Sequence, residues 1–293
     1  MKKCWLALLM LAALPAAAEI AVRDDGGAEV RLARPAQRVA TLAPHATELV
    51  FAAGGGERMV GASDYSDYPP AARALPRIGG SQQIDTERLI ALRPDLLVVW
   101  LHGNTAQQLA PLRRLGVALY QSEPGSLEDI PDEIERLGRL MGTERTAQPA
   151  AAALRSRLAQ LAARYRERPA VKVFYQVSER PLYTLNGRQI VSDAIRLCGG
   201  VNVFADLPVL APAVTVEAVL QADPEIIIAG ARGGQDAGGL AMWKLYPGLL
   251  AVRRGNLYSI ESDLIGRAGP RMIDGAEALC KLLDQARARR GTK

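Results

Sequence analysis

Side chains suited to holding a flat, apolar ligand occur in loops next to predicted strands. Tyr65 and Tyr183 provide aromatic rings in two such loops, and Trp100 ends an apolar run just before His102 and Asn104. Because only 5% of the residues are aromatic, their position in loops favours ligand binding over core packing for Tyr65 and Tyr183. Trp100 fits a core position equally well.

Catalytic and metal chemistry have less support. The chain contains only His45 and His102, too few for a three-histidine zinc site. It has no Gly-x-Ser-x-Gly elbow, phosphate-binding glycine loop or dense His/Asp/Glu cluster. We therefore predict that the protein is not an enzyme and that it has no metal site and no cofactor. An α/β hydrolase-type enzyme is the weaker alternative. His102 could reach the metal centre of a ligand, although a surface position is favoured, and His45 or Thr47 is expected to cap a helix.

One helix–strand unit is used twice. In Thr86–Trp100 a glutamate, Glu87, stands seven residues before a proline, and an acidic residue then opens an aliphatic strand. The same pattern recurs 130 positions later, from Val216 to Ala229, with Glu217 in the place of Glu87. A lone surface glutamate is ordinarily just solvated, but identical placement in two copies suggests a partner with two-fold symmetry.

Alternating strand and helix patterns around each copy predict an α/β fold with mostly parallel sheets flanked by helices. Strong helix formers at helical spacing predict one long, rigid connecting helix. We expect an N-terminal lobe over residues 19–145, this connector over 146–168 and a C-terminal lobe over 169–293. The ligand-binding loops should then face each other across a cleft, at the carboxyl ends of the strands.

The first 18 residues have the features of a secretory signal peptide. Lys2 and Lys3 precede an apolar run too short to span a bilayer of roughly 30 Å, and three alanines precede Glu19. Its removal lowers the net charge from +5 to +3, which does not indicate a nucleic-acid partner. Export leaves only Cys198 and Cys280, for which we predict a disulfide bond, with two buried free thiols as the alternative.

Five segments, taken together and in order, resemble the periplasmic cobalamin-binding proteins. They are RVATLAPHATE (38–48), YSDYPP (65–70), ERLIALRPDL (87–96), LCGGVNVF (197–204) and RAGPR (267–271). That family belongs to the helical-backbone class of substrate-binding proteins, which serve ABC importers of cobalamin, haem and iron–siderophores. The resemblance implies capture of cobalamin or a related corrinoid in the periplasm, and haem or a ferric siderophore is the alternative ligand. We expect a monomer.

The resemblance also implies roles for individual residues. Tyr65, Trp100 and Tyr183 match aromatic positions that pack on the corrin, and Asp263 and Arg267 match a polar pair across the cleft; Asn104 and His102 are further candidate ligand contacts. Ser81 and Ala211 stand where the family has two more aromatic residues. Glu87 and Glu217 match acidic residues that dock into arginine pockets of the importer's membrane subunits, and Cys198 and Cys280 match the family's disulfide.

Overall fold

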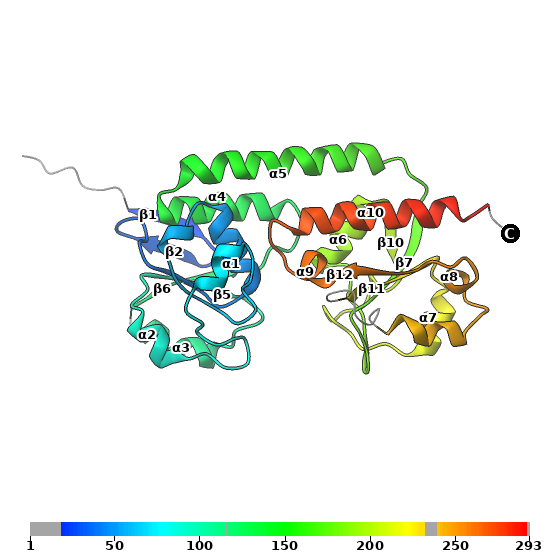
Figure 1. Cartoon of the computed structure of the whole chain (residues 1–293), viewed down its shortest axis with the longest axis horizontal. Coiled ribbons are helices and arrows are strands. Elements are labelled where there is room, and N and C mark those ends of the chain that lie inside the picture. Colours follow the sequence, from blue (N-terminus) through cyan, green and yellow to red (C-terminus); the bar gives the residue numbers. More distant parts are fainter. Residues whose placement is uncertain (1–18, 115, 232–238, 292–293) are drawn as a thin grey trace, which may run out of the picture.

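The computed structural model describes residues 19–114, 116–231 and 239–291. The predicted signal peptide, residues 1–18, lies outside these ranges. None of the helices within them combines the length and apolar character needed to cross a membrane. Two α/β halves lie side by side, and one long helix passes along both (Figure 1). This confirms the predicted fold class.

The N-terminal half is built on a four-stranded parallel sheet in the order β4-β3-β5-β6. The hairpin of β1 and β2 is antiparallel and precedes this sheet. The elements are β1 (Ile20–Arg23), β2 (Glu29–Leu32), β3 (Val39–Thr41), α1 (Pro44–Ala52), η1 (Gly56–Arg58), β4 (Met59–Ala62), η2 (Pro70–Ala74), α2 (Thr86–Ala91), β5 (Leu96–Trp100), α3 (Ala106–Arg114), β6 (Ala118–Ser122) and α4 (Asp129–Met141).

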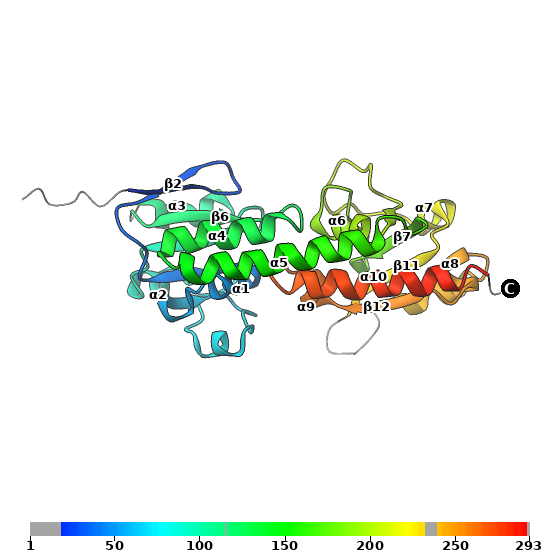
Figure 2. The same ribbon diagram turned by 90° about the horizontal axis from the view of Figure 1, so that it is seen from above.

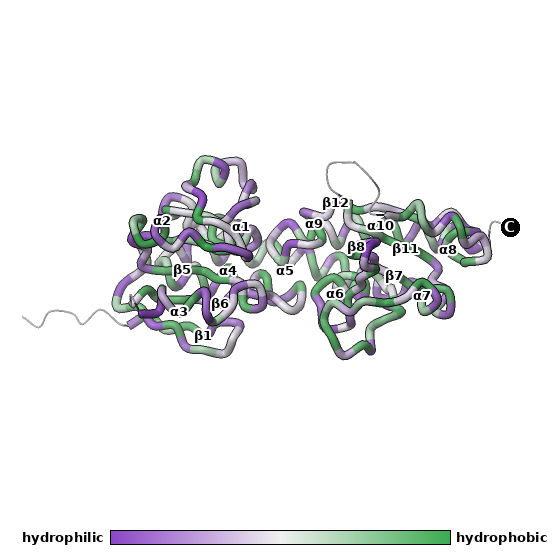
Figure 3. Tube along the Cα trace, turned by 90° about the horizontal axis from the view of Figure 1, so that it is seen from below, coloured by the Kyte–Doolittle hydropathy of each residue, from purple (hydrophilic) through white to green (hydrophobic). Residues whose placement is uncertain are grey.

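The C-terminal half has its own four-stranded parallel sheet, in the order β10-β7-β11-β12. Its elements are β7 (Val171–Gln176), β8 (Ser178–Glu179), β9 (Leu182–Tyr183), α6 (Ile190–Leu197), β10 (Gly200–Asn202), α7 (Val216–Ala222), β11 (Ile226–Ala231), η3 (Leu240–Leu245), α8 (Leu250–Arg253), β12 (Leu257–Glu261), α9 (Ser262–Ile265) and α10 (Met272–Ala288). The central strands β5 and β11 are strongly hydrophobic, as expected for strands covered on both faces (Figure 3).

The two halves share one topology. In each sheet, with the strands counted in chain order, the second strand lies at one edge beside the first, and the third and fourth follow on the other side of the first. The helix–strand unit repeats down to its backbone: Arg93 and Asp223, 130 positions apart, both have positive φ just before the proline (45° and 41°). The N-caps match as well, since Asp85 and Thr215 each accept a hydrogen bond from the backbone N–H three residues on.

Helix α5 (Glu144–Tyr165) covers most of the predicted connector and is bound to both halves. Arg155 forms ion pairs with Glu135 (2.7 Å) and Asp132 (2.6 Å) of α4. Two residues further on, Arg157 pairs with Asp274 of α10 at 2.6 Å. Seen from above, α5 crosses from α4 to lie beside α10 (Figure 2). The helix therefore links the halves as a continuous rod.

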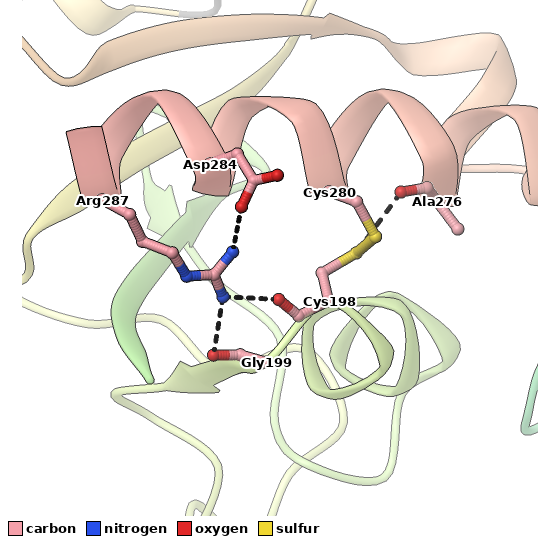
Figure 4. Close-up of a disulfide and its surroundings, with 6 residues drawn as sticks. All are labelled: Cys198, Gly199, Ala276, Cys280, Asp284 and Arg287. Atoms are coloured by element: carbon pink, nitrogen blue, oxygen red, sulfur yellow. Dashed lines mark hydrogen bonds and ion pairs between the residues drawn. A yellow bond between two sulfur atoms is a disulfide. The ribbon is translucent and has the colours of Figure 1, made fainter. Parts of the chain in front are cut away.

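The predicted disulfide between Cys198 and Cys280 is present and joins the end of α6 to α10. Arg287 of α10 donates to the carbonyl oxygens of Cys198 (2.7 Å) and Gly199 (3.2 Å), so it also caps the end of α6 (Figure 4). Both cysteines are completely buried, and the alternative of two free thiols is wrong.

One local prediction is wrong. Helix α1 begins at Pro44, with Ala43 as its N-cap and no side-chain cap, so neither His45 nor Thr47 caps it. Proline is favourable in the first turn because it lacks an N–H that would in any case be unpaired. His45 and Thr47 consequently lie inside the helix and are buried. This burial gives both residues roles in the candidate site.

Candidate functional site

The loop that carries Tyr65 is anchored on both sides by buried hydroxyl groups. Ser63 and Ser66 bond to each other through their Oγ atoms (3.0 Å), and Ser66 is bonded to Thr47 of α1 (2.9 Å). The guanidinium of Arg77 donates to both serine carbonyl oxygens, at 3.0 and 2.8 Å. Tyr65, between these anchors, has a positive φ of 62° and is 71% exposed. The loop therefore presents the Tyr65 ring outside the core.

Trp100 is the last residue of β5 and is 37% exposed, so it is not a core residue. Together with Tyr65 it lines a cavity of about 320 Å³. Polar residues of the 80–83 segment line the same cavity: Ser81, Gln82 and Gln83. A cavity lined by two aromatic rings and by amide groups suits a flat ligand that carries hydrogen-bonding substituents.

The turn after Trp100 holds the other two candidates. Asn104 is 5% exposed, and its Oδ1 accepts a hydrogen bond from the Trp100 N–H at 2.9 Å. Its buried Nδ2 has no partner among the described residues, so its role as a ligand contact stays a prediction. His102 has an exposed side chain, as expected for a surface position, and its Nδ1 contacts Glu123 Oε2 at 2.6 Å.

The remaining candidates lie in the C-terminal half. Tyr183, in β9, is 38% exposed and is not among the residues that line the 320 Å³ cavity. Asp263, in α9, forms an ion pair with Arg267 at 2.9 Å. Arg267 also bonds to Asp67 at 2.7 Å, and Asp67 belongs to the same loop as Tyr65. The structure thus brings Arg267 next to the N-terminal half, with only 11% of its side chain exposed.

Two residues that sequence reasoning did not select complete this contact. Glu48 of α1 accepts two hydrogen bonds from Arg271, at 2.6 and 3.0 Å, and lies 3.5 Å from Arg267. The guanidinium of Arg271 also stacks over the Tyr68 ring, 4.1 Å from its centroid. The only sequence signal was their presence in segments 38–48 and 267–271. We call Glu48, Asp67, Asp263, Arg267 and Arg271 the inter-half cluster.

The inter-half cluster has three carboxylates against two guanidinium groups. Burial alone would raise the pKa of Asp67, but the hydrogen bond from Arg267 and its positive charge hold that pKa below the usual range. The hydrogen bond to Glu48 raises the pKa of Arg271. Both shifts favour the charged forms of Asp67 and Arg271, and the cluster has a formal charge of −1 from its three carboxylates and two guanidinium groups. A ligand that hydrogen-bonds Arg267 would have to share it with three carboxylates that already lie within 3.5 Å.

Glu87 and Glu217 lie away from these contacts. Each is an exposed residue in the first turn of its helix, α2 or α7. Both helices lie on the side of the molecule opposite α5, one in each half (Figure 1). A hydrogen bond from its own backbone N–H and one from Thr215 lower the pKa of Glu217, which favours its charged form. The two helices that carry these carboxylates thus lie on the same side of the molecule (Figure 1).

The model of the periplasmic binding protein family matches residues 39–264. The chain is 38% identical to the vitamin B12-binding protein of Vibrio cholerae over 85% of this chain and 90% of that protein. The crystal structure of the periplasmic vitamin B12-binding protein of Vibrio cholerae superposes with a TM-score of 0.80, at 39% identity, over 86% of this chain and 98% of that one. A periplasmic haem-binding protein of Pseudomonas aeruginosa superposes with a TM-score of 0.72, at 28% identity, over 84% and 91%.

Proposed function

Because the chain belongs to the periplasmic binding protein family, we propose that it captures cobalamin or a related corrinoid in the periplasm and delivers it to an ABC importer of the inner membrane. The observation that carries this proposal is the 38% identity to a vitamin B12-binding protein along 85% of the chain. The protein acts as a substrate-binding protein and not as an enzyme. The N-terminal signal peptide over residues 1–18 directs its export.

The cavity beside Trp100 is the corrinoid site in this proposal. Tyr65 and Trp100 provide flat surfaces for the macrocycle, because both rings line the cavity and are partly exposed. Tyr183 provides a third surface from the C-terminal half. Asn104, Asp263 and Arg267 offer hydrogen bonds to the amide groups at the edge of a corrinoid. Ser81, at a position where the family has an aromatic residue, lines the cavity together with Gln82 and Gln83, whose amide groups offer further hydrogen bonds.

Docking uses the side of the molecule opposite α5, where α2 and α7 lie (Figure 1). Glu87 and Glu217 each contact an arginine-rich pocket on one of two membrane subunits. A carboxylate accepts two parallel hydrogen bonds from a guanidinium group, which fixes orientation as well as adding affinity. The matching positions of the two carboxylates in α2 and α7 support this assignment. The chain acts as a monomer with pseudo-two-fold symmetry.

Haem is the second candidate ligand, and one contact favours it. Glu123 bonds to Nδ1 of His102, which is the arrangement that orients a histidine whose other nitrogen binds a metal. Trp100 lines the cavity, and His102 is only two residues further along the chain. A ferric siderophore is a weaker alternative, since no other described contact favours it.

Calorimetry with cyanocobalamin, cobinamide and haemin tests the proposal. We expect both corrinoids to bind and to remain bound through gel filtration, where the corrin absorption spectrum identifies the complex. The variant Trp100→Ala should bind them more weakly. If haemin alone binds and gives a Soret band that is lost in His102→Ala, the haem reading replaces the corrinoid reading.

A further inference from the structure

The Trp100 indole rests on a glycine. A Cβ atom added to Gly103 would lie 2.0 Å from Cε3 and 2.2 Å from Cδ2 of Trp100. The indole therefore packs directly over the Gly103 main chain, at a distance that no side chain permits. Gly103 does not have the positive φ that disfavours other residues, so its backbone would accept an alanine. The ring alone accounts for the need for glycine.

Asn104 brings Gly103 under the ring. Its Oδ1 accepts from the Trp100 N–H at 2.9 Å, and its own N–H donates to the Trp100 carbonyl at 3.0 Å. These two bonds close the turn from residue 100 to residue 104. Because Asn104 is buried, water does not compete for either bond.

A second ring packs against the indole. The imidazole of His45 lies in a T-shaped contact with Trp100, with ring centroids 5.9 Å apart and planes at 79°. His45 Nε2 contacts the carbonyl oxygen of Ser122 at 3.4 Å, and Ser122 is the residue that pairs with Trp100 in the sheet. The imidazole is thus held by a backbone group of the neighbouring strand β6.

We propose that Gly103, Asn104 and His45 are positioning residues that hold the Trp100 indole in one orientation before the ligand arrives. This inference rests on the proposed function, because it assigns Trp100 to the wall of the ligand cavity. A ring that is already fixed loses no rotamer entropy when a ligand stacks on it, so the three residues increase affinity without touching the ligand.

The test uses the chain from Glu19 onward, in which Trp100 and Trp243 are the tryptophans. Trp243 is fully buried, so acrylamide quenching of fluorescence reports mainly on Trp100. Gly103→Ala should increase the quenching in the ligand-free protein and weaken cyanocobalamin binding by about tenfold. The matched control is Gly248→Ala, which lies outside the cavity lining and where a Cβ would meet nothing within 4 Å. The control should change neither value.

A second variant covers the case in which Gly103→Ala is misfolded. His45→Ala removes the ring contact and should increase the quenching of Trp100. His45→Phe retains a ring at this position, so its quenching should stay close to that of the wild type. In a Trp100→Ala background, Gly103→Ala should have no further effect on affinity, because the displaced ring is gone.

Two results would overturn the inference. One is unchanged quenching in both Gly103→Ala and His45→Ala, which would mean that neither residue holds the ring. The other is increased quenching with unchanged cyanocobalamin affinity, which would mean that the ring's orientation does not matter for binding. If the wild-type protein binds no corrinoid, the proposed function fails instead, and the quenching comparison still decides whether the ring is held.

Discussion

Arg271 and Glu48 form a two-bonded ion pair between the two halves of the molecule. The Arg271 Nε and Nη2 atoms donate to the two carboxylate oxygens at 3.0 and 2.6 Å. Glu48 belongs to α1 of the first half, and its side chain is only 1% exposed; Arg271 immediately precedes α10 of the second half. A buried carboxylate therefore depends on a cation from the other half.

We predict that Arg271→Met lowers the free energy of unfolding by about 3 kcal/mol, because it leaves a buried charge without its main partner. Methionine keeps apolar contact with Tyr68 and tests the charge alone. Urea unfolding measures the change. Arg31→Met, which removes two exposed ion pairs, is the control and should have little effect. Equal effects of the two variants would contradict the importance of the inter-half pair.

His45 should make stability depend on pH. Burial lowers its pKa from 6.5 to about 4. Between these values the unfolded chain takes up a proton that the folded protein does not, so the contribution of His45 is complete above pH 6.5 and is lost as the pH falls toward 4. We expect a loss of about 2 kcal/mol between about pH 7.5 and about pH 5, relative to His45→Gln. If urea unfolding gives the same change in the free energy of unfolding with pH for the wild type and His45→Gln, the prediction is wrong.

Sequence patterns predicted the elements best where periodicity was long. The connecting helix predicted over 146–168 overlaps α5, Glu144–Tyr165, over residues 146–165. The strands β8, β9 and β10 were not predicted, because two or three residues are too few to form a pattern. Their pairing depends on neighbours that only the folded chain provides.

The candidate site was predicted in its exposed part and missed in its buried part. Tyr65 could be selected because aromatic residues at loop positions are few, whereas Trp100 was selected through the family resemblance; both residues line the same cavity. The sequence predicted His45 as a possible helix cap. In the structure the helix already begins at Pro44, so His45 lies inside the helix and is buried. Glu48 and Arg271 look like ordinary helix charges, and only the packing of the halves makes them partners.

Replacing both docking glutamates should separate capture from transport. In Glu87→Ala/Glu217→Ala we expect unchanged cyanocobalamin affinity by calorimetry and no uptake by cells that depend on this importer. Each single variant should reduce uptake less. Glu57→Ala/Glu167→Ala removes one exposed carboxylate from the N-terminal half and one from the end of the connector, and is the matched control. Normal uptake in the docking double variant would refute the assignment.

The disulfide should contribute mainly through the unfolded chain. It closes a loop of 82 residues, for which the chain-entropy relation gives about 4 kcal/mol. Cys198→Ala/Cys280→Ala should lower the free energy of unfolding by up to this amount in urea. Ligand affinity should persist, because Arg287 still holds the end of α6 to α10. A double variant as stable as the wild type would show that the loop is already restricted without the bond.

Ligand binding should move the two halves very little. Helix α5 is bound to α4 through Arg155 and to α10 through Arg157, only two residues further along, so bending between the halves must break one of these contacts or the helix itself. Spin labels at Ala74→Cys and Val209→Cys, exposed in opposite halves, report the inter-half distance by pulsed electron paramagnetic resonance. We expect cyanocobalamin to shift the mean distance by no more than about 2 Å. In an Arg155→Ala/Arg157→Ala background the distribution of inter-half distances should broaden before ligand is added, because the ion pairs of α5 with α4 and α10 are lost. A large ligand-induced closure in the wild type would mean that α5 bends as a hinge despite its contacts with both halves.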